Sequence, residues 1–144
     1  MGKYSFGVQS SINLEQCCFD LQYVMNNAIA MDLMDFSITE GYRGKARQNR
    51  FFDIGKSRVK WPDGKHNSIP SKAVDAVPYI NNKSSYNKLH CCVLAGIILA
   101  TAKKLGIEIR WGGNWDQDGE PVTDQGFQDL VHYEVLDGKT ENID

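Results

Sequence analysis

The sequence has almost no excess of charge of either sign, which argues against one broad class of function. Its 144 residues include 16 basic and 18 acidic side chains, for a net charge of −2. Domains that bind nucleic acids usually gather a basic excess on one face, so we expect no nucleic-acid partner. Basic residues do cluster between Arg43 and Lys60. This cluster is either a solvated helix face followed by a basic loop, or a positive wall that attracts an anionic polymer such as a cell wall.

The sequence also lacks a long apolar run and a secretory signal. The longest apolar run, from Leu89 to Ala102, is interrupted by His90 and is shorter than the roughly 18 residues that span a bilayer. Residues 1–9 contain neither the basic start nor the apolar stretch of a signal peptide. We therefore expect synthesis in the cytoplasm and no insertion into a membrane.

Cysteine spacings typical of zinc knuckles or redox dithiols are absent. The four cysteines form two adjacent pairs, Cys17-Cys18 and Cys91-Cys92, instead of pairs separated by two residues. Both pairs lie in segments with a helical pattern. We expect them to serve as small buried apolar residues.

The hydrophobic pattern predicts a mixed α+β fold. The length suits one domain over residues 1–144. The pattern predicts helices over 14–32, 44–54 and 86–105, and strands over 35–39, 73–79, 107–111 and 130–136. Asn13 is the expected cap of the first helix, and Pro78 should halt the second strand. Because helices and strands do not alternate regularly, we expect a mostly antiparallel central sheet packed by helices.

Two long polar loops, 56–71 and 112–127, each lead into a strand that carries a candidate metal ligand. Long ordered loops in small domains are often functional. Of only three histidines, His66 and His132 lie in polar segments near acidic residues. Zinc favours imidazole nitrogen with a carboxylate oxygen, and a catalytic site leaves the fourth position open. His66, Asp75 and His132 would form such a set, although spacing alone does not distinguish it from three unrelated residues.

Two further residues are candidates for catalysis. Asp129, three residues before His132, could exchange a proton with water and with a leaving amine, or it could form a turn before a strand. Arg43 follows a predicted turn, where a guanidinium could hold a carboxylate or an oxyanion, or it could be a surface arginine at a helix start. We expect His90, inside the apolar helix, to be a hydrogen-bonded structural histidine.

Part of the second loop has the alternating oxygen ligands and central glycine of a calcium-binding loop. The candidate ligands are Asn114, Asp116, Asp118 and Asp124. The pattern departs at its end, where Gln125 replaces the bidentate glutamate. A calcium site and a solvated acidic loop both remain open interpretations.

Four blocks of sequence carry a resemblance to a known family. They are FSITEGYRGKARQ at 36–48, KHNSIPSKAVDAVPY at 65–79, GIEIRWGGNWDQDG at 106–119 and DLVHYEV at 129–135. In this order they resemble the zinc peptidases that include the D-alanyl-D-alanine carboxypeptidases and the phage L-alanyl-D-glutamate endopeptidases used as endolysins. The resemblance implies the hedgehog/D,D-peptidase-like α+β fold, with the metal on the sheet and a groove across it.

The resemblance also implies a role for each candidate residue. The implied roles are His66, Asp75 and His132 as zinc ligands, Asp129 as general base and acid, and Arg43 as the residue that polarises or anchors the substrate. Trp111 and Trp115 are candidates for the walls of the groove, or for packing alone.

The expected function is hydrolysis of a peptide bond in peptidoglycan stem peptides by a zinc-dependent monomer, with calcium as a second candidate ion. We expect an L-alanyl-D-glutamate endopeptidase that acts as a phage endolysin, made in the host cytoplasm and acting on the cell wall in the periplasm after release. One alternative is a D-alanyl-D-alanine carboxypeptidase. Two others are a non-catalytic metal- or wall-binding module of the same fold, as in hedgehog signalling domains, and a calcium-dependent structural module.

Overall fold

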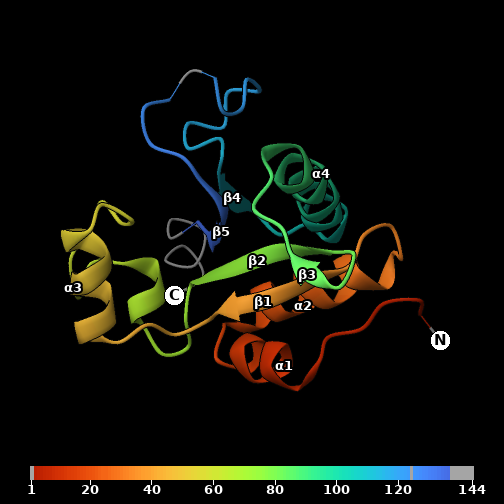
Figure 1. Ribbon diagram of the computed structural model, residues 1–144, viewed down its shortest axis with the longest axis horizontal. Helices are drawn as coiled ribbons and strands as arrows, with labels where there is room; N and C mark the ends of the chain where they lie inside the picture. The colour runs from red at the N-terminus through yellow and green to blue at the C-terminus, as the bar shows by residue number, and fades with distance from the viewer. Residues whose placement is uncertain (1, 124, 137–144) are drawn as a thin grey trace.

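An antiparallel sheet lies at the centre of the molecule (Figure 1). The computed structural model describes residues 2–123 and 125–136. Its helices are α1 (Val8–Glu15), α2 (Phe19–Ala30), α3 (Lys45–Asp53) and α4 (Lys88–Leu105), with a 3₁₀ turn η1 (Lys65–Asn67). Its strands are β1 (Phe36–Glu40), β2 (Ala73–Ile80), β3 (Lys83–Ser84), β4 (Ile109–Gly112) and β5 (Asp129–Val135). The order in the sheet is β1-β2-β5-β4, β3 pairs with the end of β2, and every pair is antiparallel. The predicted mixed α+β class is confirmed.

The core lies between the sheet and two helices. Helices α2 and α4 contact each other and both contact the sheet, burying apolar residues such as Leu21, Leu94, Ile98 and Tyr133. Helix α4 begins after Asn87, whose side chain accepts hydrogen bonds from the first turn. Among the described residues, no helix, α4 included, is long and apolar enough to cross a membrane.

The helix predicted over 14–32 is wrong, because the chain forms two helices there. Helix α1 ends at Glu15, and Cys17 leaves the helical path to form a parallel bridge with Ser71. Two backbone hydrogen bonds stabilise this break between the helices. Ser71 N–H donates to Gln16 O (2.8 Å), and Cys18 N–H donates to Ser71 O (2.9 Å). Asn13, the predicted cap, instead lies inside α1 and donates its amide to Ile38 O. A long-range backbone pairing thus overrides a continuous apolar pattern.

The predicted end of the second strand at Pro78 is also wrong, since β2 continues to Ile80. Pro78 lies opposite Phe36 of β1. On the other side of β2, the pairing with β5 covers only Ala73–Asp75. Beyond that pairing, Pro78 uses only its carbonyl, which accepts a hydrogen bond from Ser85 N–H (2.8 Å). A residue without an N–H is therefore tolerated at this position.

Candidate metal centre and groove

Strand register brings two of the three candidate metal ligands together. Asp75 on β2 lies directly opposite His132 on β5, and side chains opposite each other in an antiparallel pair are near neighbours. His66, from η1, approaches the same point, where its Nε2 lies 3.1 Å from Asp75 Oδ1. One ligand atom from each of the three lies within 4.8 Å of the others, and all three residues are buried. This cluster could hold a metal ion.

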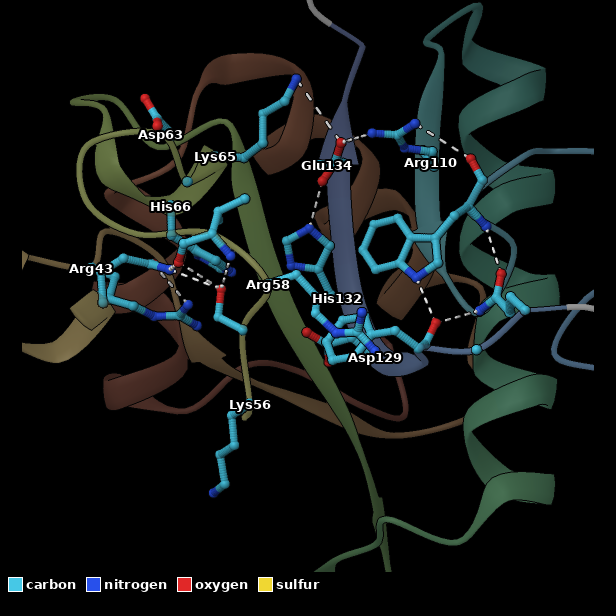
Figure 2. Close-up of a pocket in the computed structure, with 18 residues that line it drawn as sticks. Arg43, Lys56, Arg58, Asp63, Lys65, His66, Arg110, Asp129, His132 and Glu134 are labelled. Carbon is cyan, nitrogen blue, oxygen red and sulfur yellow. Dashed lines mark hydrogen bonds and ion pairs between the residues drawn. The ribbon is translucent and has the colours of Figure 1, made fainter. Parts of the chain in front are cut away.

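Each histidine of the cluster is oriented by a second partner outside it. His66 Nδ1 lies 2.7 Å from Gly41 O. His132 Nε2 lies 2.8 Å from Glu134 Oε1 (Figure 2). Because a carbonyl and a carboxylate accept hydrogen bonds, these two nitrogens carry the protons. His66 Nε2 and His132 Nδ1 then face the cluster with free lone pairs when the rings are neutral. This histidine-to-acceptor arrangement is typical of metal sites.

The close contact at Gly41 depends on the absence of a side chain. A Cβ on Gly41 would collide with the carbonyl of Asn13. The turn after β1 can therefore lie against α1 while its carbonyl points at His66. Arg43, two residues further on, fixes the same region, since its N–H donates to His66 O at 2.8 Å.

Buried charges are concentrated at the cluster. Burial would raise the pKa of Asp75, but the neighbouring His66 and His132 hold it well below its usual range. Burial would lower the pKa of His132, but its interactions with Asp75 and Glu134 raise it to about 9. Burial also opposes ionisation of Glu134, yet His132 and Arg110 lower its pKa to about 2. The ionised carboxylates and the basic groups beside them thus stabilise one another.

Arg43 and Asp129 lie on either side of this cluster. The Arg43 guanidinium is buried, lies 3.6 Å from Asp75 Oδ2, and donates to Gln48 Oε1 at 3.1 Å. Asp129 begins β5 opposite Gly112, where a Cβ would collide with the Asp129 backbone. Burial and then the charge of Asp75 raise the pKa of Asp129. A carboxyl with a raised pKa beside a candidate metal site is suited to proton transfer.

A groove passes over the cluster and consists of two adjoining pockets. The first has a volume of about 470 Å³ and is lined by residues that include Arg43, His66, His132 and Asp129. The second, of about 580 Å³, is lined by residues that include Arg43, Asp75 and Asp129. Because Arg43 and Asp129 line both pockets, the candidate catalytic residues lie where the two halves of the groove meet.

The two tryptophans proposed as groove walls or packing residues have different positions in the structure. Trp115 lines the first pocket, where its ring lies 5.5 Å from that of His132 and 6.2 Å from that of Phe127. Trp111 is only 4% exposed, packs in the core, and donates its indole N–H to Leu130 O. The prediction of Trp111 as a groove wall is corrected: it is a packing residue.

The candidate calcium ligands that the structure describes, Asn114, Asp116 and Asp118, line neither pocket. Asp116 Oδ1 and Asp118 Oδ1 each accept a backbone N–H two residues further along the loop. Asn114 Oδ1 is buried and has no hydrogen-bond partner among the described residues. Asp124 lies outside the described residues, so calcium binding stays a prediction. His90, as expected for a structural residue, hydrogen-bonds to Ser85 (2.7 Å).

Sequence reasoning missed several residues that organise the site. Glu134 joins His132, Arg110 (2.7 Å) and Lys65 (4.0 Å) (Figure 2). The signal for Glu134 was available, because residues i and i+2 of a strand share a face. No comparable signal existed for Gln48, which is 1% exposed, because its hydrogen-bond partners come from segments that are separate in the sequence. They are Arg43, Ser57, Val59 and Asn67.

Comparisons with known proteins agree with this architecture. The fold is that of the crystal structure of the L-Ala D-Glu endopeptidase ChiX from Serratia marcescens, with a TM-score of 0.76, 24% identity, and coverage of 96% of this chain and 95% of that one. The sequence is 31% identical over 136 residues to the L-alanyl-D-glutamate peptidase of Escherichia phage T5, covering 92% of this chain and 98% of that protein. Residues 2–136 match the family model of phage L-alanyl-D-glutamate peptidases. The chain belongs to this family, and the resemblance predicted from the four sequence blocks is confirmed.

Proposed function

We propose that this protein hydrolyses the bond between L-alanine and D-glutamate in the stem peptides of peptidoglycan. The observation that carries the proposal is the buried His66, Asp75 and His132 cluster beside Asp129 in a groove, in a member of the phage L-alanyl-D-glutamate peptidase family. The names of the phage T5 and Serratia proteins specify the same bond. A D-alanyl-D-alanine carboxypeptidase, which the sequence left open, has no comparable support.

Zinc is the metal that the donor set fits best. Two imidazole nitrogens and one carboxylate oxygen leave a position open for catalysis, and each histidine already has the outer hydrogen bond that fixes its tautomer. When bound, zinc lowers the pKa of water and polarises the peptide carbonyl. Cobalt and manganese fit the same ligands almost as well. Calcium remains a second proposed ion, on the alternating oxygen side chains of Asn114, Asp116 and Asp118.

The chain's own residues supply proton transfer and charge stabilisation. We propose that the Asp129 carboxylate takes a proton from the attacking water and returns it to the departing D-glutamyl amine. The raised pKa of Asp129 suits a group that must both accept and release a proton. Arg43 lies at the junction of the two pockets, where its fixed positive charge would stabilise the developing oxyanion or anchor the substrate.

Family membership also supports a role at the cell wall. We propose that the protein acts as a phage endolysin, as a monomer that is made in the host cytoplasm and reaches peptidoglycan in the periplasm after release. The groove has a pocket on each side of the residues shared by both, Arg43 and Asp129 among them. This arrangement suits a substrate that continues on both sides of the scissile bond better than a carboxypeptidase substrate, which is cut at its chain end.

Mass spectrometry of digested Gram-negative peptidoglycan tests the proposed bond. The expected products are glycan strands whose lactyl groups carry only L-alanine, and free peptides with an N-terminal D-glutamate. Removal of metal with EDTA should abolish the products, and so should the His132→Ala substitution. His90 is the one histidine outside the cluster, so the control variant His90→Ala should still form them. Release of D-alanine alone would contradict the proposal and favour a carboxypeptidase.

A further inference from the structure

The first pocket has a strongly basic wall, and its cations differ in their partners. Three of the five are paired with carboxylates: Arg43 with Asp75, and both Lys65 and Arg110 with Glu134. The other two are Lys56 and Arg58. Neither forms an ion pair with any of the described residues, and both are exposed.

Arg58 is held over an aromatic ring instead of against an acid. Its guanidinium carbon lies 4.6 Å from the centre of the Phe127 ring, which stacks on Trp115, which in turn contacts the ring of His132. Arg58 belongs to the loop after α3, and Phe127 to the loop before β5, so this contact joins the two long loops beside the metal centre. Figure 2 shows Arg58 between the sides of the pocket that carry Arg43 and Asp129.

This placement leaves the hydrogen-bonding edge of Arg58 available. A guanidinium that packs on a ring uses its face, while its N–H donors point outward in the plane. Those donors match a carboxylate in the two-point geometry that arginine favours. Lys56 lines both pockets, and its ammonium lies 5.7 Å from the centre of the Phe51 ring, which lines the second pocket. Lys56 therefore adds a second positive charge where the two pockets meet. An anion at that end of the first pocket would have two cations near it that no described carboxylate neutralises.

The proposed substrate supplies such an anion close to the scissile bond. D-Glutamate contributes its amine to the bond that is cut, and only one of its two carboxyl groups can continue the peptide. The other stays a free carboxylate on the residue next to the scissile nitrogen. The substrate therefore carries a negative charge on the residue that provides the scissile nitrogen.

We propose that Arg58, assisted by Lys56, binds the free carboxylate of the D-glutamyl residue and thereby selects D-glutamate over its neutral amide, D-isoglutamine. This inference rests on the proposed function and adds a specificity-determining subsite to it. The D-glutamyl side of the substrate would then occupy the first pocket, and the alanyl side the second.

Two matched synthetic stem peptides test the subsite. One contains D-glutamate, and the other contains D-isoglutamine, in which an amide replaces the free carboxylate. The zinc-loaded wild-type protein should cleave the first with a higher kcat/KM. Arg58→Gln should lower kcat/KM for the D-glutamate peptide roughly ten- to hundredfold, mainly through KM, because a charge-assisted hydrogen bond is lost. It should leave the D-isoglutamine peptide almost unchanged, so the preference disappears.

Three further variants separate the subsite from a general charge effect. Lys56→Gln should reduce the preference less than Arg58→Gln, and Arg58→Lys should restore part of it, since the charge remains but the planar fork is lost. Arg50→Gln, an exposed arginine of α3 that lines neither pocket, should behave as wild type.

The outcomes distinguish this inference from the proposed function. If the wild-type protein cleaves neither peptide, the proposed function fails. If it cleaves both equally well, or if Arg58→Gln lowers both activities by the same factor, the function stands and the carboxylate subsite is refuted.

Discussion

The floor and the rim of the groove are built on different physical principles. The floor, formed by His66, Asp75, His132 and Glu134, is buried, and each of these side chains is fixed by an acceptor, a cation or a neighbouring ring nitrogen. The rim, formed by residues of the 56–64 loop together with Trp115 and residues 125–128, carries exposed cations that lie over aromatic rings. The floor is therefore preorganised for one geometry, whereas the rim presents positive charge that no described carboxylate neutralises.

This difference separates chemistry from recognition. A buried network loses its function when one member is removed, because the remaining charges are left without partners in a poorly solvated site. An exposed cation is screened by solvent, and its removal costs the stability of the fold little. We expect substitutions in the floor to affect kcat and metal affinity, and those in the rim to affect KM and substrate preference.

The largest effect should come from Asp129, at the boundary of the two regions. Asp129→Asn keeps the size of the side chain but removes the proton acceptor, so kcat should fall roughly 10²- to 10⁴-fold. Zinc should still bind, because Asp129 is not one of the three clustered ligands. Steady-state kinetics on a defined stem peptide, with zinc content measured on the same sample, check both expectations.

Asp63 offers a matched control for this change. It lines the same pocket but is exposed, so Asp63→Asn should change kcat less than about threefold. Equal losses in the two variants would show that the pocket needs negative charge in general. Full activity of Asp129→Asn would remove it from the mechanism.

Glu134 tests whether the floor acts as one unit. Glu134→Gln preserves shape but weakens the hydrogen bond that orients His132 and removes the partner of Arg110. Zinc affinity should fall roughly 10- to 100-fold, as for other outer partners of metal-bound histidine. Competition with a zinc chelator measures this loss, and kcat at saturating zinc should fall much less. Unchanged affinity would mean that the backbone alone holds His132 in place.

The fold was predictable where local signals determine structure. The apolar pattern of α4, the cap at Asn87 and the glycine stop at Gly106 place that helix almost without tertiary information. The break at Cys17 was not predictable, because it depends on a pairing with Ser71, which is distant in sequence. Strand alternation, by contrast, already placed Trp111 on the same face as Ile109, and both are buried in the core.

The candidate site was predictable in its residue types but not in its geometry. The scarcity of histidine and the family blocks singled out His66, Asp75 and His132, yet only the register of β2 with β5 places Asp75 opposite His132. The cations of the rim carried no individual signal. Whether Lys56 or Arg58 has a carboxylate partner depends on how two loops fold against each other, and no local pattern encodes that.

The last prediction concerns pH, and it distinguishes floor from rim directly. In the zinc-free protein the pKa of His132 is raised to about 9 by Asp75 and Glu134, against the opposing effect of burial. Zinc binds the neutral ring, so below pH 9 it must displace a proton. The apparent zinc affinity should therefore rise about tenfold for each unit of pH between 6 and 8 through His132, and this dependence should flatten as pH passes 9.

Calorimetric titration of zinc at pH 7, in buffers of different ionisation enthalpy, measures the displaced protons. About one proton should be released from His132 for each zinc bound. Arg58→Gln should release the same number, because a rim residue does not contact His132, whereas Glu134→Gln should release fewer as the pKa of His132 falls toward its ordinary value. A binding heat independent of the buffer would mean that His132 is already neutral at pH 7, and the floor would then lack the charge coupling that sets it apart from the rim.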